Sequence, residues 1–337
     1  MSIRGFVLFL SLTAALFTAT FSASAVTVNE AREAARPKQS APPPPIHVGD
    51  DSAMTITQAA ILGLVEGLTE YLPVSSTGHL LLAEKLMGLD ADAGLSADEA
   101  ARRKDAIEAY IICIQAGAII AVLGLYFRRV RQMGAGLTKK DPQGRRLIVN
   151  ILAGFVPAAV IGLLCGKYIK MWLFGSWPVV AAWFVGGVLI LLVHYRQAGR
   201  RRAGLDLEAM TWKMALIVGL MQCVAMWPGV SRSLVTIVGG LLSGLSLSAA
   251  VEFSFLLGLI TLGAATAYDA LKHGQEMLSM FSPAALMTGV LFAFVSAVAA
   301  VRWMVAYLNK HSMAIFGYYR VILALVVGGL LLCGAMN

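Results

Sequence analysis

The fold of this chain is decided by the stretch Glu66-Gly-Leu-Thr-Glu70-Tyr-Leu-Pro73-Val-Ser75-Ser76-Thr77-Gly78-His79. It combines two carboxylates, three consecutive hydroxyl side chains and an imidazole, with apolar sequence on both sides. Ionisable groups are costly inside a bilayer, so such a cluster indicates a functional site. Pro73 lacks a backbone donor and disfavours helix at the residue before it. The stretch therefore predicts two short helices joined by a loop.

A second stretch has the same character: Trp227-Pro-Gly-Val-Ser231-Arg232-Ser233-Leu-Val-Thr236. The two stretches align at an offset of 156 residues, with Ser75 matching Ser231, Gly63 matching Gly219, and Glu66 facing Gln222. A few such identities arise by chance, so the prediction of two related halves depends on the arrangement of spans described below.

Composition places these stretches in a membrane protein. Of 337 residues, 58% are hydrophobic and 14% are charged, whereas soluble domains carry about a quarter charged residues. Several apolar runs have the length of about 20 residues that a bilayer span requires. The net charge of +8 gathers in 128–146 and 196–202, which predicts cytoplasmic loops and not nucleic-acid binding. The four cysteines lie in apolar runs without metal-site spacing.

We predict an all-α polytopic membrane protein with six full transmembrane helices and two re-entrant helical hairpins. The hairpins are expected within 54–87 and 210–245, and the full spans at 106–127, 147–166, 179–195, 249–271, 283–308 and 315–333. The segment 88–105 is expected as a surface loop, 167–178 as a short loop, and Tyr318 to Arg320 as an interface anchor. Three spans separate the hairpins, so these enter from opposite faces. The halves, about 54–195 and 210–335, are then inverted-topology repeats.

The first 53 residues precede this membrane domain of 54–337. Residues 1–25 resemble a secretory signal peptide, with Arg4, an apolar stretch and Ala23-Ser-Ala25; an uncleaved anchor is the alternative. Residues 26–53, which contain four consecutive prolines from Pro42, are expected to form a disordered linker.

The first stretch suggests metal and phosphate chemistry. Glu66 and Glu70 share one helix face, and such paired carboxylates suit Mg²⁺ or Ca²⁺; two carboxylates in a wet vestibule are the alternative. Ser75, Ser76 and Thr77 at a helix start suit anion binding, or simple helix capping. His79 is within reach of Ser76 for acid–base work, or for the activation of a nucleophile.

The second stretch adds the cation. The guanidinium of Arg232 matches phosphate oxygens with a planar fork, and an ion pair with Glu66 or Glu70 is compatible with that role. Together these residue types predict metal-assisted handling of a phosphate or diphosphate on a lipid.

These motifs resemble those of undecaprenyl-diphosphate phosphatase, the bacitracin-resistance protein family. The resemblance rests on Glu66-Gly-Leu-Thr-Glu70, the following Leu-Pro-Val-Ser-Ser-Thr-Gly-His79, and Pro228-Gly-Val-Ser-Arg-Ser-Leu-Val-Thr236. It covers about 54–335, and the first 53 residues depart from the family pattern.

The resemblance implies an enzyme that removes the terminal phosphate of undecaprenyl diphosphate and so recycles the carrier lipid for cell-wall synthesis. Ser76 is then the expected nucleophile, with His79 competing for that role or for acid–base work, and Glu66 and Glu70 serve the metal or act as base. Phosphate binding would fall to the remaining polar residues of the two stretches: Ser75, Thr77, Ser231, Arg232, Ser233 and Thr236.

A rival function is a polyprenyl-phosphate transporter or flippase, because broken helices in inverted repeats are a transporter design. A phosphatidic-acid-type phosphatase fits less well, since its lysine–arginine–proline motif is missing. We expect a location in the bacterial inner membrane, with the site open to the periplasmic side, and a lipid diphosphate as partner. The sequence leaves a homodimer open.

Overall fold

The computed structural model describes residues 54–89, 96–138, 140–197 and 204–334. The predicted signal peptide and linker of residues 1–53 lie outside the described residues. Everything described is helix or connection between helices, apart from one isolated bridge between Leu205 and Leu245.

Six helices of the described residues are long and apolar enough to cross a membrane, which makes this a multi-pass membrane protein. They are α4 (Ala97–Leu125), α6 (Pro142–Leu173), α7 (Ser176–Gln197), α10 (Leu247–Met280), α11 (Pro283–Leu308) and α12 (Ala314–Leu332). Four of them, α6, α7, α10 and α11, contain the predicted spans, and α11 matches its predicted bounds. The helices α4 and α12 overlap their predicted spans but end two residues and one residue before them, respectively.

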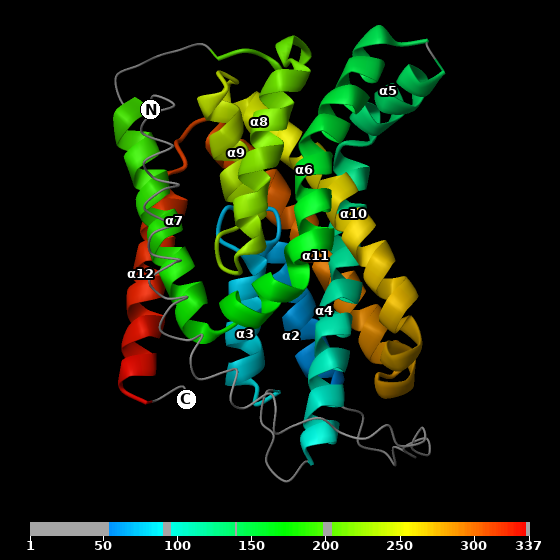
Figure 1. The fold of residues 1–337 in the computed structure, drawn as a ribbon, viewed down its shortest axis with the longest axis vertical. Helices are drawn as coiled ribbons and strands as arrows, with labels where there is room; N and C mark the ends of the chain where they lie inside the picture. Colours follow the sequence, from blue (N-terminus) through cyan, green and yellow to red (C-terminus); the bar gives the residue numbers. More distant parts are fainter. Residues whose placement is uncertain (1–53, 90–95, 139, 198–203, 335–337) are drawn as a thin grey trace. The chain divides into compact units, whose positions relative to one another are not determined.

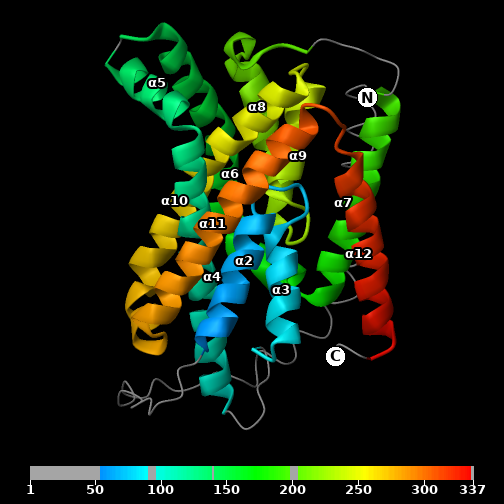
Figure 2. The ribbon, with the colours of Figure 1, turned by 180° about the vertical axis from the view of Figure 1, so that it is seen from behind.

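The two interrupted regions form pairs of short helices. The first pair is α2 (Ile56–Thr69) and α3 (Ser76–Leu86); the second is α8 (Trp212–Gln222) and α9 (Arg232–Leu242), with a 3₁₀ turn η2 (Cys223–Met226) after α8. In Figures 1 and 2 the first pair fills the lower part of the helical domain and the second pair the upper part, with their loops near the middle.

The offset of 156 residues holds for the helix bounds. It relates the first residues of α2 and α8, and both the first and the last residues of α3 and α9. It also relates their N-caps: Thr55 and Thr211 each accept a backbone N–H three residues on, while Ser75 and Ser231 have φ of 73° and 78°. A positive φ is uncommon outside glycine, so its recurrence at matched positions indicates that both loops share one backbone conformation.

Three connections differ from prediction. The loop expected over 88–105 is wrong in its second part, because α4 begins at Ala97. Ser96 and Glu99 form a capping box there, and the acidic first turn suits the helix dipole. The expected loop 167–178 is also wrong, since α6 runs to Leu173 and α7 starts at Ser176.

The third difference lies in the basic segment 128–146, which contains a further helix, α5 (Phe127–Leu137). Its Arg129 forms salt bridges of 2.8 Å with both Glu208, in the 3₁₀ turn η1 (Leu207–Ala209), and Glu252 on α10. Hydrogen bonds from its own backbone and from Arg129 hold the pKa of the Glu208 carboxyl below its usual range. The basic segment is therefore tied to the helices at its end of the protein.

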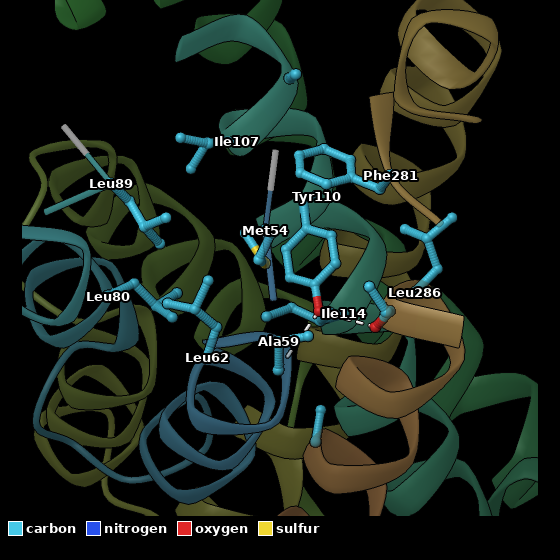
Figure 3. Packing of buried hydrophobic residues seen from close by; sticks show 13 residues of the cluster. Met54, Ala59, Leu62, Leu80, Leu89, Ile107, Tyr110, Ile114, Phe281 and Leu286 are labelled. Atoms are coloured by element: carbon cyan, nitrogen blue, oxygen red, sulfur yellow. Dashed lines mark hydrogen bonds between the residues drawn. The ribbon is translucent and has the colours of Figure 1, made fainter. Parts of the chain in front are cut away.

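The first helix of each short pair packs on a long helix of the other half. The helix α2 lies along α11, where a Cβ at Gly63 would overlap the backbone of Gly289; α8 lies along α6, where a Cβ at Gly219 would overlap Gly154. Tyr110 of α4 closes the first of these packings by donating to the carbonyl of Ala285 (Figure 3). Glycine allows this close approach, and the two halves interlock through it.

Candidate active site

The candidate site lies where the two loops between the short helices meet. Ser233 Oγ donates a 2.8 Å hydrogen bond to the carbonyl of Leu72, so the start of α9 is joined directly to the first loop. Each loop breaks helix for a local reason: Pro73 in the first, and Pro228-Gly229 with a Gly229 φ of 92° in the second.

Arg320 of α12 holds both loops. Its guanidinium donates to the carbonyls of Pro73 at 3.2 Å and Gly229 at 2.8 Å, two positions that the 156-residue offset relates. It also donates to Ala182 of α7 at 2.9 Å. Its side chain is fully buried, so the prediction of an interface anchor is wrong for Arg320. Sequence reasoning failed here because Tyr318 and Tyr319 on the same turn are exposed, as an anchor requires.

A carboxylate, a hydroxyl and a guanidinium meet between the loops. Arg232 Nη2 donates to Glu70 Oε1 at 3.0 Å, and Ser76 Oγ donates to Glu70 Oε2. The Glu70 side chain is 6% exposed, so a buried ion pair fixes α9 to the end of α2. The expected ion pair of Arg232 with Glu70 is confirmed.

Several buried polar atoms here have no protein partner. They are Glu66 Oε1, Arg232 Nε, the Tyr71 hydroxyl and both polar atoms of the Gln222 side chain. The Arg232 guanidinium also lies 5.7 Å from the centre of the Tyr71 ring. Buried polar groups are nearly always paired, so a cluster of unpaired ones indicates that a polar ligand completes the site.

Two cavities adjoin this cluster. One, of about 240 Å³, is lined by Glu70, Ser76, Gln222 and Arg232 among others. The second, of about 570 Å³, is lined by Glu66 and by apolar side chains of α3 and α4. Ser76, Thr77 and Gln115 line both cavities, so the hydroxyl that contacts Glu70 lies between a polar and a more apolar space.

The sequence is similar to those of known proteins over most of its length. A family model described as the bacitracin resistance protein BacA matches residues 59–326. This chain belongs to the BacA family. An undecaprenyl-diphosphatase 2 of Rhodospirillum rubrum is 44% identical over 272 residues, covering 81% of this chain and 93% of the relative. An undecaprenyl-diphosphatase of Sorangium cellulosum is 42% identical over 273 residues, covering 80% and 84%. One of Methylococcus capsulatus is 44% identical over 273 residues, covering 80% and 92%.

The remaining predicted residues of this BacA protein divide into two groups. Ser75 and Ser231 line the polar cavity with Thr77. Ser231 also caps α9 by accepting from the backbone of Leu234. Thr236, in contrast, is enclosed, and its hydroxyl bonds the carbonyl of Arg232 and Ser254 Oγ. Thr236 and Ser233 therefore support the loop from behind, whereas the others border the cavity.

His79 points away from this group. Its Nδ1 lies 2.7 Å from the carbonyl of Ser75 and its Nε2 lies 2.7 Å from the Tyr319 hydroxyl, on whose ring it stacks. Neither cavity is lined by it. The BacA-family motif thus contains one residue that the fold directs toward α12, although His79 and Ser76 are neighbours on α3.

Sequence reasoning missed Gln115, Gln222 and Arg320 as parts of the site. Gln222 was visible as the repeat mate of Glu66, but an amide carries no chemical signal of its own. Gln115 lies within α4, where its side chain contacts Glu66 and Thr266. Nothing in its local sequence separates it from a polar residue facing a neighbouring helix.

Proposed function

We infer that this protein is an undecaprenyl-diphosphatase, which hydrolyses undecaprenyl diphosphate to undecaprenyl phosphate and inorganic phosphate in a bacterial membrane. Family membership supports the activity. The main support for the location of the catalytic site is that Ser76 and Arg232 both contact the same carboxylate, Glu70, at the wall of one cavity. A nucleophile, a base and a phosphate-binding cation are thereby brought within one another's reach.

We propose that Ser76 is the nucleophile. Its Oγ attacks the terminal phosphorus while its proton passes to Glu70, and the bond from that phosphorus to the bridging oxygen breaks. Undecaprenyl phosphate leaves, and water then hydrolyses the phosphoserine to serine and inorganic phosphate. Arg232 stabilises the charge that develops on the phosphoryl oxygens. His79 as nucleophile, or direct attack by water, are the competing mechanisms.

A divalent cation, Mg²⁺ or Ca²⁺, is part of this proposal. The residues fit it because Glu66 Oε1 is a buried carboxylate oxygen without a protein partner, one turn before Glu70. No group of three or more acidic, histidine or cysteine side chains suited to a metal occurs within the described ranges. Glu66 and Glu70 would therefore share the cation with oxygens of the substrate. Such an ion neutralises phosphate charge when bound.

We further propose that the two short-helix pairs are re-entrant hairpins and the halves inverted repeats. The odd number of long helices between the pairs supports this, as does the meeting of their loops. The basic residues of 128–138 and 140–146 support a cytoplasmic location for the end of the protein at which α5 lies. The first hairpin then enters from the periplasmic side of the inner membrane, and the larger cavity, lined by α3 and α4, opens toward that side.

Purified protein tests the activity. In detergent with Mg²⁺ or Ca²⁺, we expect release of inorganic phosphate from undecaprenyl diphosphate, and greatly reduced release by the Ser76→Ala variant. Lipid movement across reconstituted vesicles without phosphate release by the wild type would instead favour the transporter that the architecture also permits.

A further inference from the structure

Gln222, at the end of α8, is a buried amide without a protein partner. Its side chain is 2% exposed, and neither Oε1 nor Nε2 is hydrogen-bonded to any described residue. It nevertheless lines the polar cavity together with Glu70, Ser76 and Arg232. A polar group in this position opposes folding unless something else binds it.

A second buried amide shows what a structural role looks like. Asn150 on α6 is also 2% exposed and its Oδ1 has no partner among the described residues, but its Nδ2 donates to the carbonyl of Met210 at 3.0 Å and so connects α6 to the start of α8. Gln222 makes no such connection. A polar side chain at this buried helix end is therefore not explained by the fold.

The repeat relates Gln222 to a residue of the first loop region. At the 156-residue offset, Gln222 corresponds to Glu66, and Arg232 corresponds to Ser76. One half thus supplies the carboxylate and the hydroxyl, and the other supplies the amide and the guanidinium. A third carboxylate in place of Gln222 would repel a diphosphate, whereas an amide N–H can donate to it.

We propose that Gln222 is a substrate-binding residue, whose amide N–H donates to a phosphate oxygen of the lipid diphosphate beside Arg232. The contact satisfies a donor that the protein leaves unpaired. It rests on the proposed function for the identity of the substrate, and it adds a second donor from the same half of the chain as Arg232.

The test is Gln222→Met, which keeps the length of the side chain and removes its polar atoms. We expect kcat/KM for undecaprenyl diphosphate to fall roughly ten- to hundred-fold, while Tm stays the same or rises, because a buried unpaired amide is removed. The matched control is Asn150→Leu. It loses a bond between helices, so its Tm should fall while kcat/KM per folded molecule stays at the wild-type value.

Binding of a substrate analogue tests the role of Gln222 independently of phosphate release. A methylene-bridged polyprenyl diphosphate, which cannot be hydrolysed, should raise the Tm of the wild type and raise it less in Gln222→Met and Gln222→Glu. This readout holds even if the wild type releases no phosphate, a result that would refute the proposed function alone. Unchanged analogue binding in both variants would overturn the role of Gln222. So would a lower Tm or loss of folded Gln222→Met protein, because the amide would then support the fold.

Discussion

Arg232 forms an ion pair with Glu70 and is also the proposed phosphate-binding residue, so its removal would affect stability and activity together. Its Nη2 pairs with Glu70, and its Nε is buried without a protein partner. A single Arg232→Ala change leaves the Glu70 charge buried alone, which costs about 3–5 kcal/mol of stability. We therefore expect low folded yield as well as lost activity from that variant.

The double variant Arg232→Met with Glu70→Gln removes both charges and so tests the stability effect alone, because its rate also reflects the loss of Glu70 as the proposed base. We expect its Tm to recover toward that of the wild type while phosphate release stays at least about a hundred-fold below it. Arg232→Lys, which keeps the charge but not the planar fork, should also lose most of its rate. Near-normal turnover by Arg232→Lys would contradict phosphate binding through the fork.

The two glutamates should differ in their response to metal. Glu66 Oε1 is unpaired, whereas both oxygens of Glu70 are bonded to protein. Glu66→Gln should shift the Mg²⁺ or Ca²⁺ concentration for half-maximal activity upward by about ten-fold or more, with little change in Tm. Titration of phosphate release against metal measures this. An unchanged titration would remove Glu66 from the cation site.

Ser76 and His79 can be distinguished by trapping. Ser76 Oγ contacts Glu70, while both ring nitrogens of His79 contact other groups. After a rapid acid quench with substrate labelled in the terminal phosphate, we expect acid-stable label on Ser76. A quench in alkali, which preserves phosphohistidine, is the necessary companion. Label on His79 there would reverse the assignment, and absence of label under both conditions would favour direct attack by water.

At the scale of elements, the sequence predicts breaks better than ends. Pro73 and Pro228 mark the loops because a missing N–H acts locally, and the hydrophobic runs mark the six spans. The ends of α4 and α6 extend past the apolar residues, since capping by Ser96 and continuing helix propensity do not depend on hydropathy. The burial of Arg320 could not be predicted, because its partners are backbone carbonyls of segments 91 and 247 residues away.

The contacts of α2 and α8 with their long partner helices make a stability prediction. Gly63→Ala and Gly219→Ala each place a methyl group against the backbone of another helix, so we expect each to lower stability by about 1–3 kcal/mol. Gly263→Ala on α10 is the control, because nothing lies within 4 Å of its added Cβ, and alanine there should be neutral or stabilising by up to about 1 kcal/mol. Thermal unfolding in detergent measures all three. Equal Tm values for Gly63→Ala and Gly263→Ala would contradict close helix contact at Gly63.

At the scale of the whole molecule, the two halves are held together by helices of one half that pack on helices of the other. The first helix of each short pair, α2 or α8, packs on a long helix of the other half, and one arginine of the last helix bonds matched carbonyls in both loops. The helix α9, in contrast, packs on α10 of its own half. The candidate site consequently needs the complete domain, because each half supplies only some of its residues.

The orientation of the long helices in the membrane can be tested, because the positive charges predict which end lies in the cytoplasm. The start of α4 and the turn between α11 and α12 lie at opposite ends of the long helices, so a cysteine at Asp98 and one at Lys310 report opposite faces. Both positions are exposed. In a variant lacking Cys113, Cys165, Cys223 and Cys333, a membrane-impermeant thiol reagent applied to spheroplasts should label Asp98→Cys directly. It should label Lys310→Cys only after permeabilisation, because positively charged segments favour the cytoplasmic side and α5 lies at that end. The reverse pattern would put the larger cavity on the cytoplasmic side and the substrate diphosphate with it.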